Sequence, residues 1–155
     1  GNHDRAVVRG QPYESGDEYA QQTLSESALA WLSKLPRERL LFDGSLKVIH
    51  DHPTERDRYT MPDAFEPALL DSEDILVLGH THIQHAAVFD EGIVVNPGSV
   101  GQPRDGNPGA AYALADVDDP SVTLHRVEYD VDRVQQRIKA TDIADWNAQR
   151  LTQER

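Results

Sequence analysis

The feature that most constrains the fold is a run of large aliphatic side chains at residues 75–78, which ends at Gly79. A strand without polar positions has to be covered on both faces, which is typical of a central strand in a sheet packed from both sides. The run is far too short to cross a bilayer, and it therefore predicts a core strand. With 155 residues the chain is long enough for one domain around one core.

The rest of the chain alternates between helical and strand patterns. Apolar residues at three- and four-residue spacing predict a helix over residues 17–35, and Asp130 is placed to cap a final amphipathic helix. Short strands are expected at residues 39–42, 46–50, 86–89, 93–95, 111–115 and 122–129, with a short helix at 62–70. Residues 1–18, 51–62 and 96–109 are expected to be loops. This mixture predicts an α/β or α+β fold with strands in the middle and a helix at each end.

Acidic side chains outnumber basic ones, with 27 Asp and Glu against 15 Lys and Arg and a formal net charge of -12. Such a surface repels nucleic-acid backbones and anionic membranes, which argues against a broad nucleic-acid groove and against a membrane partner. The acidic, lysine-poor composition resembles that of proteins from salt-loving organisms, and an ordinary acidic cytosolic protein explains it equally well. No charged-then-apolar signal segment opens the sequence, so we expect a cytoplasmic protein.

Histidines are the main candidates for chemistry. The sequence has no cysteine, so a metal ion would have to be bound by His, Asp, Glu or Asn. His3, His50, His80 and His82 each stand where an apolar strand ends or a glycine-bearing loop begins. Sheets of α/β proteins place ligand-binding groups at such positions, and neutral imidazole is a common metal ligand. His85 and His125 are expected to be structural, and His52 could either line the site or lie in the polar loop.

Four motifs occur in an order that resembles a known family: Gly1-Asn2-His3-Asp4, the strand that ends in His50, Gly79-His80-Thr81-His82, and Asn96-Pro97-Gly98-Ser99. Together they resemble the later motifs of calcineurin-like metallophosphoesterases. The small bacterial and archaeal phosphodiesterase branch is the most similar, because its members continue the last motif much as residues 100–104 do here. The resemblance extends from residue 1 to about residue 129.

This resemblance implies a four-layer αββα sandwich, two packed mixed sheets flanked by helices, with a two-metal centre at the strand ends. It implies that Asn2, His50 and His80 bind the second metal ion and that His82 binds the first. It also implies that His3 is the catalytic histidine and that Asp4 orients its imidazole. The implied cofactors are two divalent ions, manganese before zinc, iron, nickel or magnesium, about 3.5–4 Å apart.

Two departures limit the resemblance, and one arginine is a further candidate for substrate binding. The family carries an Asp-x-His and a Gly-Asp motif before its Gly-Asn-His-Asp motif, and this sequence begins at the latter. Residues 1–155 are therefore expected to form one domain that is the C-terminal portion of a metallophosphoesterase domain. Asp51 stands where the family commonly has a small residue, which puts the range of substrates in question. Arg104 could bind a substrate phosphate, although a salt bridge to a neighbouring carboxylate is the favoured interpretation.

The sequence therefore predicts a metal-dependent phosphoesterase, specifically a phosphodiesterase acting on small phosphate esters. The alternative is a non-catalytic protein of the same fold that binds a partner protein, and the intact histidines favour the enzyme. The 155-residue chain alone is expected to be inactive, because four neutral ligands cannot offset the charge of two adjacent divalent ions. Unpaired strand edges would also favour a homo-oligomer.

Overall fold

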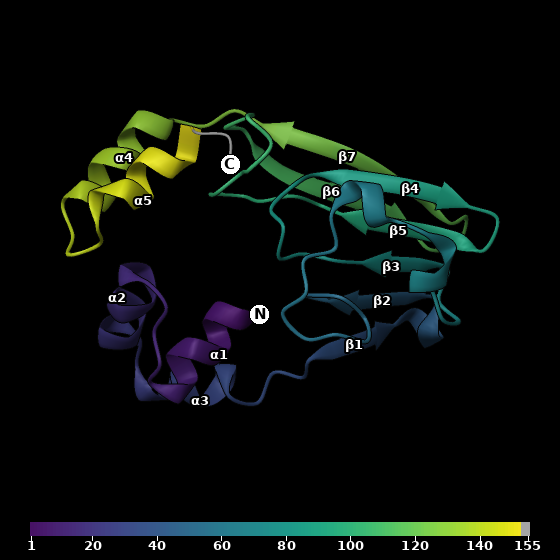
Figure 1. Ribbon diagram of the computed structural model, residues 1–155, viewed down its shortest axis with the longest axis horizontal. Coiled ribbons are helices and arrows are strands. Elements are labelled where there is room, and N and C mark those ends of the chain that lie inside the picture. Colours follow the sequence, from purple (N-terminus) through teal and green to yellow (C-terminus); the bar gives the residue numbers. More distant parts are fainter. Residues whose placement is uncertain (153–155) are drawn as a thin grey trace. The chain divides into compact units, whose positions relative to one another are not determined.

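The computed structural model describes residues 1–152, and the chain divides into two compact units (Figure 1). The first unit is helical and consists of residues 1–37 and 130–151. The second unit holds the β-sheets and consists of residues 38–129 together with Thr152. No helix among residues 1–152 is long and apolar enough to span a membrane.

The helical unit combines segments from both ends of the chain. Its helices are α1 (Asn2–Arg9), α2 (Ser15–Thr23), α3 (Glu26–Leu32), α4 (Val131–Lys139) and α5 (Asp145–Gln149), and a 3₁₀ turn (Arg150–Thr152) follows α5. The Ser15 hydroxyl accepts a hydrogen bond from the backbone N–H of Ala144 at 2.9 Å, and Arg150 pairs with Glu14 at 3.0 Å. These bonds fasten the start of α2 to the start and end of α5.

Two predictions for the helical unit were wrong. The single helix expected over residues 17–35 is divided, because Leu24 is extended and the Ser25 hydroxyl accepts a bond from the backbone of Ala28 to begin α3. Residues 2–9, expected to be loop, form α1, which has Asp4 in its first turn and ends at Gly10 in the left-handed conformation. The predicted cap of α4 is confirmed, since Asp130 accepts a bond from the backbone of Arg133 at 2.9 Å.

The sheet unit contains two sheets. The larger has the strand order β1-β2-β3-β5-β4, formed by β1 (Glu38–Leu41), β2 (Leu46–Ile49), β3 (Ile75–Val77), β4 (His85–Phe89) and β5 (Gly92–Asn96). Strands β2, β3 and β5 are parallel, and the edge strands β1 and β4 are antiparallel to their neighbours. The smaller sheet is the hairpin of β6 (Ala110–Asp116) and β7 (Ser121–Val127).

Short 3₁₀ helices occupy part of the connections in this unit: Phe42–Gly44, Pro62–Ala64 and Pro67–Leu69. The single helix expected over residues 62–70 was wrong. Two 3₁₀ turns stand there, each opened by a proline, and the residues between them and after them are extended.

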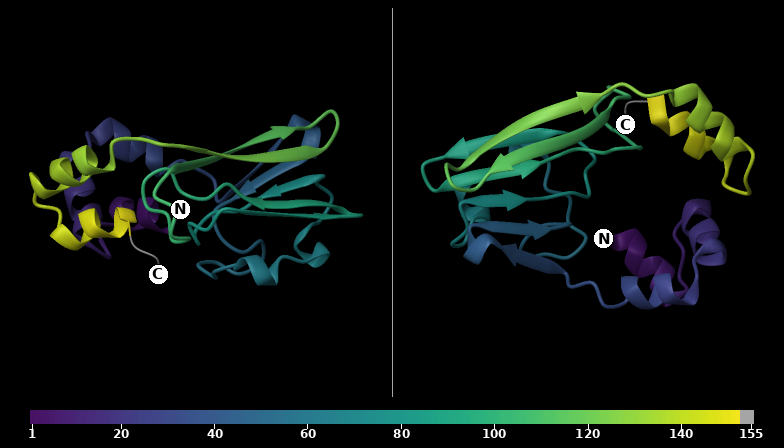
Figure 2. Two further views of the ribbon diagram at one scale, coloured as in Figure 1. Left: turned by 90° about the horizontal axis from the view of Figure 1, so that it is seen from above. Right: turned by 180° about the vertical axis from the view of Figure 1, so that it is seen from behind.

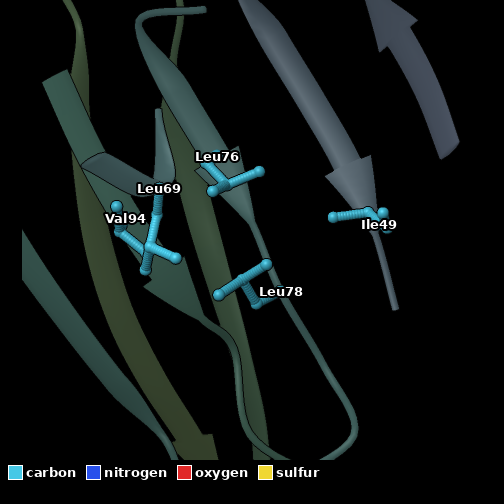
Figure 3. Packing of buried hydrophobic residues seen from close by; sticks show 5 residues of the cluster. All are labelled: Ile49, Leu69, Leu76, Leu78 and Val94. Carbon is cyan, nitrogen blue, oxygen red and sulfur yellow. The ribbon is translucent and has the colours of Figure 1, made fainter. Parts of the chain in front are cut away.

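Both faces of β3 are buried, as its apolar run predicts. Successive side chains of a strand point to opposite faces, so Ile75 and Leu76, each 0% exposed, belong to different cores. One core joins residues of the large sheet to the 3₁₀ helix at Pro67–Leu69, and Figure 3 shows its members Ile49, Leu69, Leu76, Leu78 and Val94. The other joins the opposite face to the β6–β7 hairpin, which forms a second layer in Figure 2. The predicted mixed α/β fold is confirmed.

Candidate functional site

The parallel strands bring the predicted histidines to one edge of the large sheet. His50 directly follows β2, and His80 and His82 follow β3. Because β2, β3 and β5 run in the same direction, the chain leaves them at the same edge. The rings of His50 and His80 lie 5.0 Å apart between centroids, and the N–H of Gly79 donates to the carbonyl of His50 at 3.0 Å.

Gly79 permits this approach of the two loops. A Cβ atom at this position would lie 3.3 Å from both Nδ1 and the backbone oxygen of His50. That separation is closer than ordinary van der Waals contact, so the His50 ring would have to shift if residue 79 carried a side chain. The glycine of the Gly-His-Thr-His motif thus has a packing role.

Both histidines of this motif have an unusual backbone. His80 and His82 have φ angles of 67° and 60°, in the left-handed region that non-glycine residues rarely adopt. Each such residue costs about 1–2 kcal/mol unless the surroundings hold it. The N–H of Thr81 donates to the carbonyl of Gly79 at 2.7 Å, and this bond closes a tight turn around His80. Two imidazoles are therefore carried by one short loop after β3, each on a residue with left-handed backbone.

Asn96, at the end of β5, holds this loop in place. It is 1% exposed, and its Nδ2 donates to the carbonyl of Gly79 at 2.8 Å and to the Thr81 hydroxyl at 2.9 Å. Its Oδ1 accepts a bond from the N–H of Gly98 at 2.9 Å. The last motif is thereby joined to the histidine loop. The sequence did not lead us to expect that Asn96 holds the histidine loop. The available signal was a polar residue at the end of an apolar strand.

Hydrogen bonds determine which ring nitrogens can bind a metal. The Nδ1 of His82 lies 2.9 Å from the carbonyl of Gln102, so Nδ1 donates and the neutral ring carries its lone pair on Nε2. The Nε2 of His80 lies 3.2 Å from the carbonyl of Asp57, which puts the lone pair on Nδ1. Burial lowers the pKa of His80, and the nearby charge of Arg104 acts in the same direction. His80 is therefore neutral at neutral pH, the form that a metal ligand requires.

Asp51, the departure from the family pattern, anchors the loop that faces His80. Its side chain is buried at 5% exposure, and its Oδ2 accepts a bond from the N–H of Asp57 at 2.7 Å. Asp57 has a φ of 63°, and its carbonyl is the one that His80 contacts. The carboxylate of Asp51 therefore shapes residues 51–57 beside the site.

Tyr59 and Arg104 border the same imidazole. The Tyr59 ring stacks on His80 at 4.1 Å, and its hydroxyl accepts a bond from Nη1 of Arg104 at 3.3 Å. Nη2 of Arg104 donates to Gln102 at 3.5 Å, and its buried Nε has no hydrogen-bond partner among residues 1–152. Within this part of the chain no carboxylate pairs with Arg104, so the favoured expectation of a salt bridge was wrong. Nothing in the sequence signalled the position of Tyr59.

The remaining histidines of the sheet unit have other surroundings. His85 lies edge-on to Phe65 at 5.1 Å, and His125 stacks on Tyr112 at 5.1 Å in the β6–β7 hairpin. His52 accepts a bond from the backbone of Thr54 at 3.3 Å, within the polar loop after β2.

Asn2, His3 and Asp4 belong to the helical unit, where all three lie in the first turn of α1. The carboxylate of Asp4 lies 2.6 Å from the amino group of Gly1. The Nδ1 of His3 lies 2.7 Å from Oδ1 of Asp17, and Asp17 is buried at 5% exposure. Sequence reasoning missed Asp17, which lies in a stretch expected to be the start of a helix and has no motif around it.

The donor chemistry at the sheet edge suits a divalent metal in part. Neutral imidazoles suit zinc, iron and nickel, whereas manganese favours carboxylate, carbonyl and water ligands. Among residues 1–152, however, no three His, Asp or Glu side chains form a group that could hold an ion. The sheet edge therefore supplies a pair of imidazoles, His50 and His80, with His82 on the same loop as His80.

Comparison with known families agrees with this geometry. The model of the calcineurin-like phosphoesterase superfamily domain matches residues 1–120. The chain belongs to this superfamily. The family and the fold predicted from the four motifs are thus confirmed. Members of this superfamily generally use divalent metal ions.

Individual relatives are more distant. The uncharacterized protein MJ0912 of Methanocaldococcus jannaschii is 27% identical over 180 residues, which covers 97% of this chain and 72% of that protein. Phosphodiesterase YfcE of Escherichia coli K12 is 47% identical over 53 residues, 34% of this chain and 28% of YfcE. A metallophosphoesterase from Sphaerobacter thermophilus has a TM-score of 0.80 with 26% identity, over 97% of this chain and 74% of the other. The hypothetical protein PH1004 from Pyrococcus horikoshii, 20% identical with a TM-score of 0.80 over 97% of this chain and 69% of its own, shares the fold.

Proposed function

We propose that this chain belongs to a metal-dependent phosphodiesterase that hydrolyses small phosphate esters in the cytoplasm. The observation that carries the proposal is the pair of imidazoles, His50 and His80, 5.0 Å apart at the shared edge of parallel strands. The name of the relative YfcE supports the phosphodiester as the bond that is cleaved, over the 53 residues that the two proteins share.

Four residues are proposed as metal ligands: Asn2, His50, His80 and His82. Two divalent ions, manganese before zinc, iron, nickel or magnesium, are proposed for the complete site. When bound, such ions polarise the phosphoryl group and lower the pKa of an attacking water. This chain alone offers neutral ligands, and neutral ligands do not balance the charge of two ions. We therefore expect it to hold at most one ion weakly and to show little turnover.

Arg104 is proposed to bind the substrate phosphate. A guanidinium without a carboxylate partner among residues 1–152 is unusual in a chain with a net charge of -12. Its fork of N–H groups matches two phosphate oxygens, and the contacts with Tyr59 and Gln102 hold the fork beside His80.

His3 is proposed as the general acid, with Asp4 assigned to its support by the family resemblance. As the bond between phosphorus and the leaving oxygen breaks, the oxygen keeps the electron pair and takes a proton from the imidazolium. Attack by water supplies the new bond to phosphorus.

The test compares matched histidine variants in hydrolysis of bis-p-nitrophenyl phosphate with Mn²⁺, in this chain and in the complete gene product. His80→Gln should lower both the bound manganese and the rate, because its role is to bind the ion. His3→Gln should lower the rate and leave the bound manganese unchanged. His125→Gln, in the β6–β7 hairpin, is the control and should change neither. Full metal content and full rate in His80→Gln would refute the proposal.

A further inference from the structure

Asp17 makes the hydrogen bond that the structure gives to the imidazole of His3. Its Oδ1 lies 2.7 Å from Nδ1 of His3, and its Oδ2 accepts a bond from the backbone N–H of Tyr13 at 2.9 Å. Both carboxylate oxygens are therefore engaged, one by backbone and one by the ring. The ring of Tyr13 lies edge-on to His3 with centroids 5.9 Å apart.

The burial of Asp17 determines which ring nitrogen of His3 carries a proton. Asp17 is 5% exposed, whereas 42% of the His3 side chain is exposed. A buried carboxylate is stable when hydrogen-bond donors surround it, so Asp17 requires a proton on the nitrogen that faces it. The opposite edge of the ring, with Nε2, is then the one that can meet a substrate.

Local folding explains why these two residues meet across fourteen positions of sequence. Gly10, with a φ of 68°, ends α1, and the N–H of Gln11 donates to the carbonyl of Ala6 at 2.9 Å. The chain reverses and α2 packs against α1. Asp17 then lies in the first turn of α2, where the helix dipole favours a carboxylate.

We propose that Asp17 is the positioning residue of His3, a role that the family resemblance assigns to Asp4. Asp17 holds the Nδ1 proton, so that Nε2 is the atom that donates a proton to the leaving oxygen; the ring then remains neutral with its proton on Nδ1. The proposal rests on the proposed role of His3 as the general acid, and Asp17 acts through His3 without touching the substrate.

The tautomer of His3 provides the test. The 155-residue chain is labelled with ¹⁵N-histidine, and ring nitrogens are observed by NMR at about pH 8.5, where imidazole is neutral. The signals of His3 are assigned from their loss in His3→Gln. The wild type should carry the His3 proton on Nδ1. In Asp17→Asn, the amide oxygen can accept from Tyr13 and the amide N–H can donate to Nδ1, so the proton should move to Nε2.

Asp4→Asn is the matched variant and should leave the tautomer on Nδ1. A proton on Nε2 of His3 in the wild type would overturn the proposal. Because this measurement uses no variant, the proposal can be tested even if Asp17→Asn does not fold. A tautomer that moves in Asp4→Asn and stays in Asp17→Asn overturns it as well. These measurements need no turnover, so they are separate from failure of the proposed function. In the complete gene product, Asp17→Asn should lower kcat about 100-fold or more at nearly constant KM, and an unchanged kcat would overturn the positioning role.

Discussion

Arg126 on β7 joins the hairpin to the loop that carries Gln102 and Arg104. Its guanidinium pairs with Asp105, donates from Nε to Gln84 at 3.1 Å, and donates from Nη1 to the carbonyl of Asn107 at 2.9 Å. The Nε2 of Gln84 in turn lies within hydrogen-bond distance of three backbone carbonyls, which share its two N–H groups: Pro97 at 3.3 Å, Tyr112 at 3.1 Å and His125 at 2.9 Å. Arg126 therefore ties residues 105–107 and the side chain of Gln84 to β7.

We expect Arg126→Met to lower the free energy of unfolding by about 2–3 kcal/mol at pH 7, measured by urea titration. The side chains of Arg126 and Asp105 are 20% and 17% exposed. Removing one partner of a fully buried pair costs about 3–5 kcal/mol, whereas an exposed pair contributes about 0–1 kcal/mol. A mostly buried pair with further bonds to carbonyls belongs between these limits. Arg39→Met, on the exposed strand β1, is the control and should cost less than about 0.5 kcal/mol.

The same pair predicts a dependence on pH. Burial by itself would raise the pKa of Asp105, but bonds from the backbone of Gln84, from Arg126 and from the backbone of Asn107 outweigh it and hold the pKa below its ordinary value. Because the pKa is lower in the folded than in the unfolded chain, the contribution is complete above about pH 4 and is lost as the pH falls through the folded value. The stability difference between wild type and Arg126→Met should therefore shrink toward pH 3. A difference below about 0.5 kcal/mol at pH 7, or one that stays constant with pH, would refute this reasoning.

Three further substitutions test the packing of the site. Gly79→Ala should displace the His50 ring, since the new Cβ would lie 3.3 Å from its Nδ1, and isothermal titration should show weaker binding of Mn²⁺ while the fold remains. Asn96→Ala should lower the free energy of unfolding by about 1–3 kcal/mol, because the buried Thr81 hydroxyl and the carbonyl of Gly79 lose their donor. Leu76→Ala, at 0% exposure, should cost about 2–5 kcal/mol in the same urea assay, and a loss under 1 kcal/mol would contradict its place in the core.

The sequence was informative wherever one local rule decided the outcome. The apolar run at β3 predicted a strand buried on both faces, and parallel strands then bring His50 and the Gly-His-Thr-His motif to one edge. The side chain of Asp130 caps α4 as its position predicted. In each of these cases the outcome depends on residues close together in the sequence or on the regular geometry of strands.

Other contacts depend on tertiary packing and left no mark in the sequence. The bond from His3 to Asp17 requires the chain reversal at Gly10, and the stacking of Tyr59 on His80 requires the course of a loop that Asp51 anchors. The contacts of Arg104 likewise depend on tertiary packing. An abundance of acidic residues predicted a salt bridge, whereas the folded loop places a phenol and an amide beside the guanidinium.

The histidines at the sheet edge are proposed to bind a divalent metal ion. The most direct measurement is paramagnetic line broadening of the imidazole signals of this chain when Mn²⁺ is added well below one equivalent. We predict that the signals of His50, His80 and His82 broaden first, while those of His85 and His125 remain sharp. Uniform broadening of all imidazoles, or broadening that begins at His125, would contradict it.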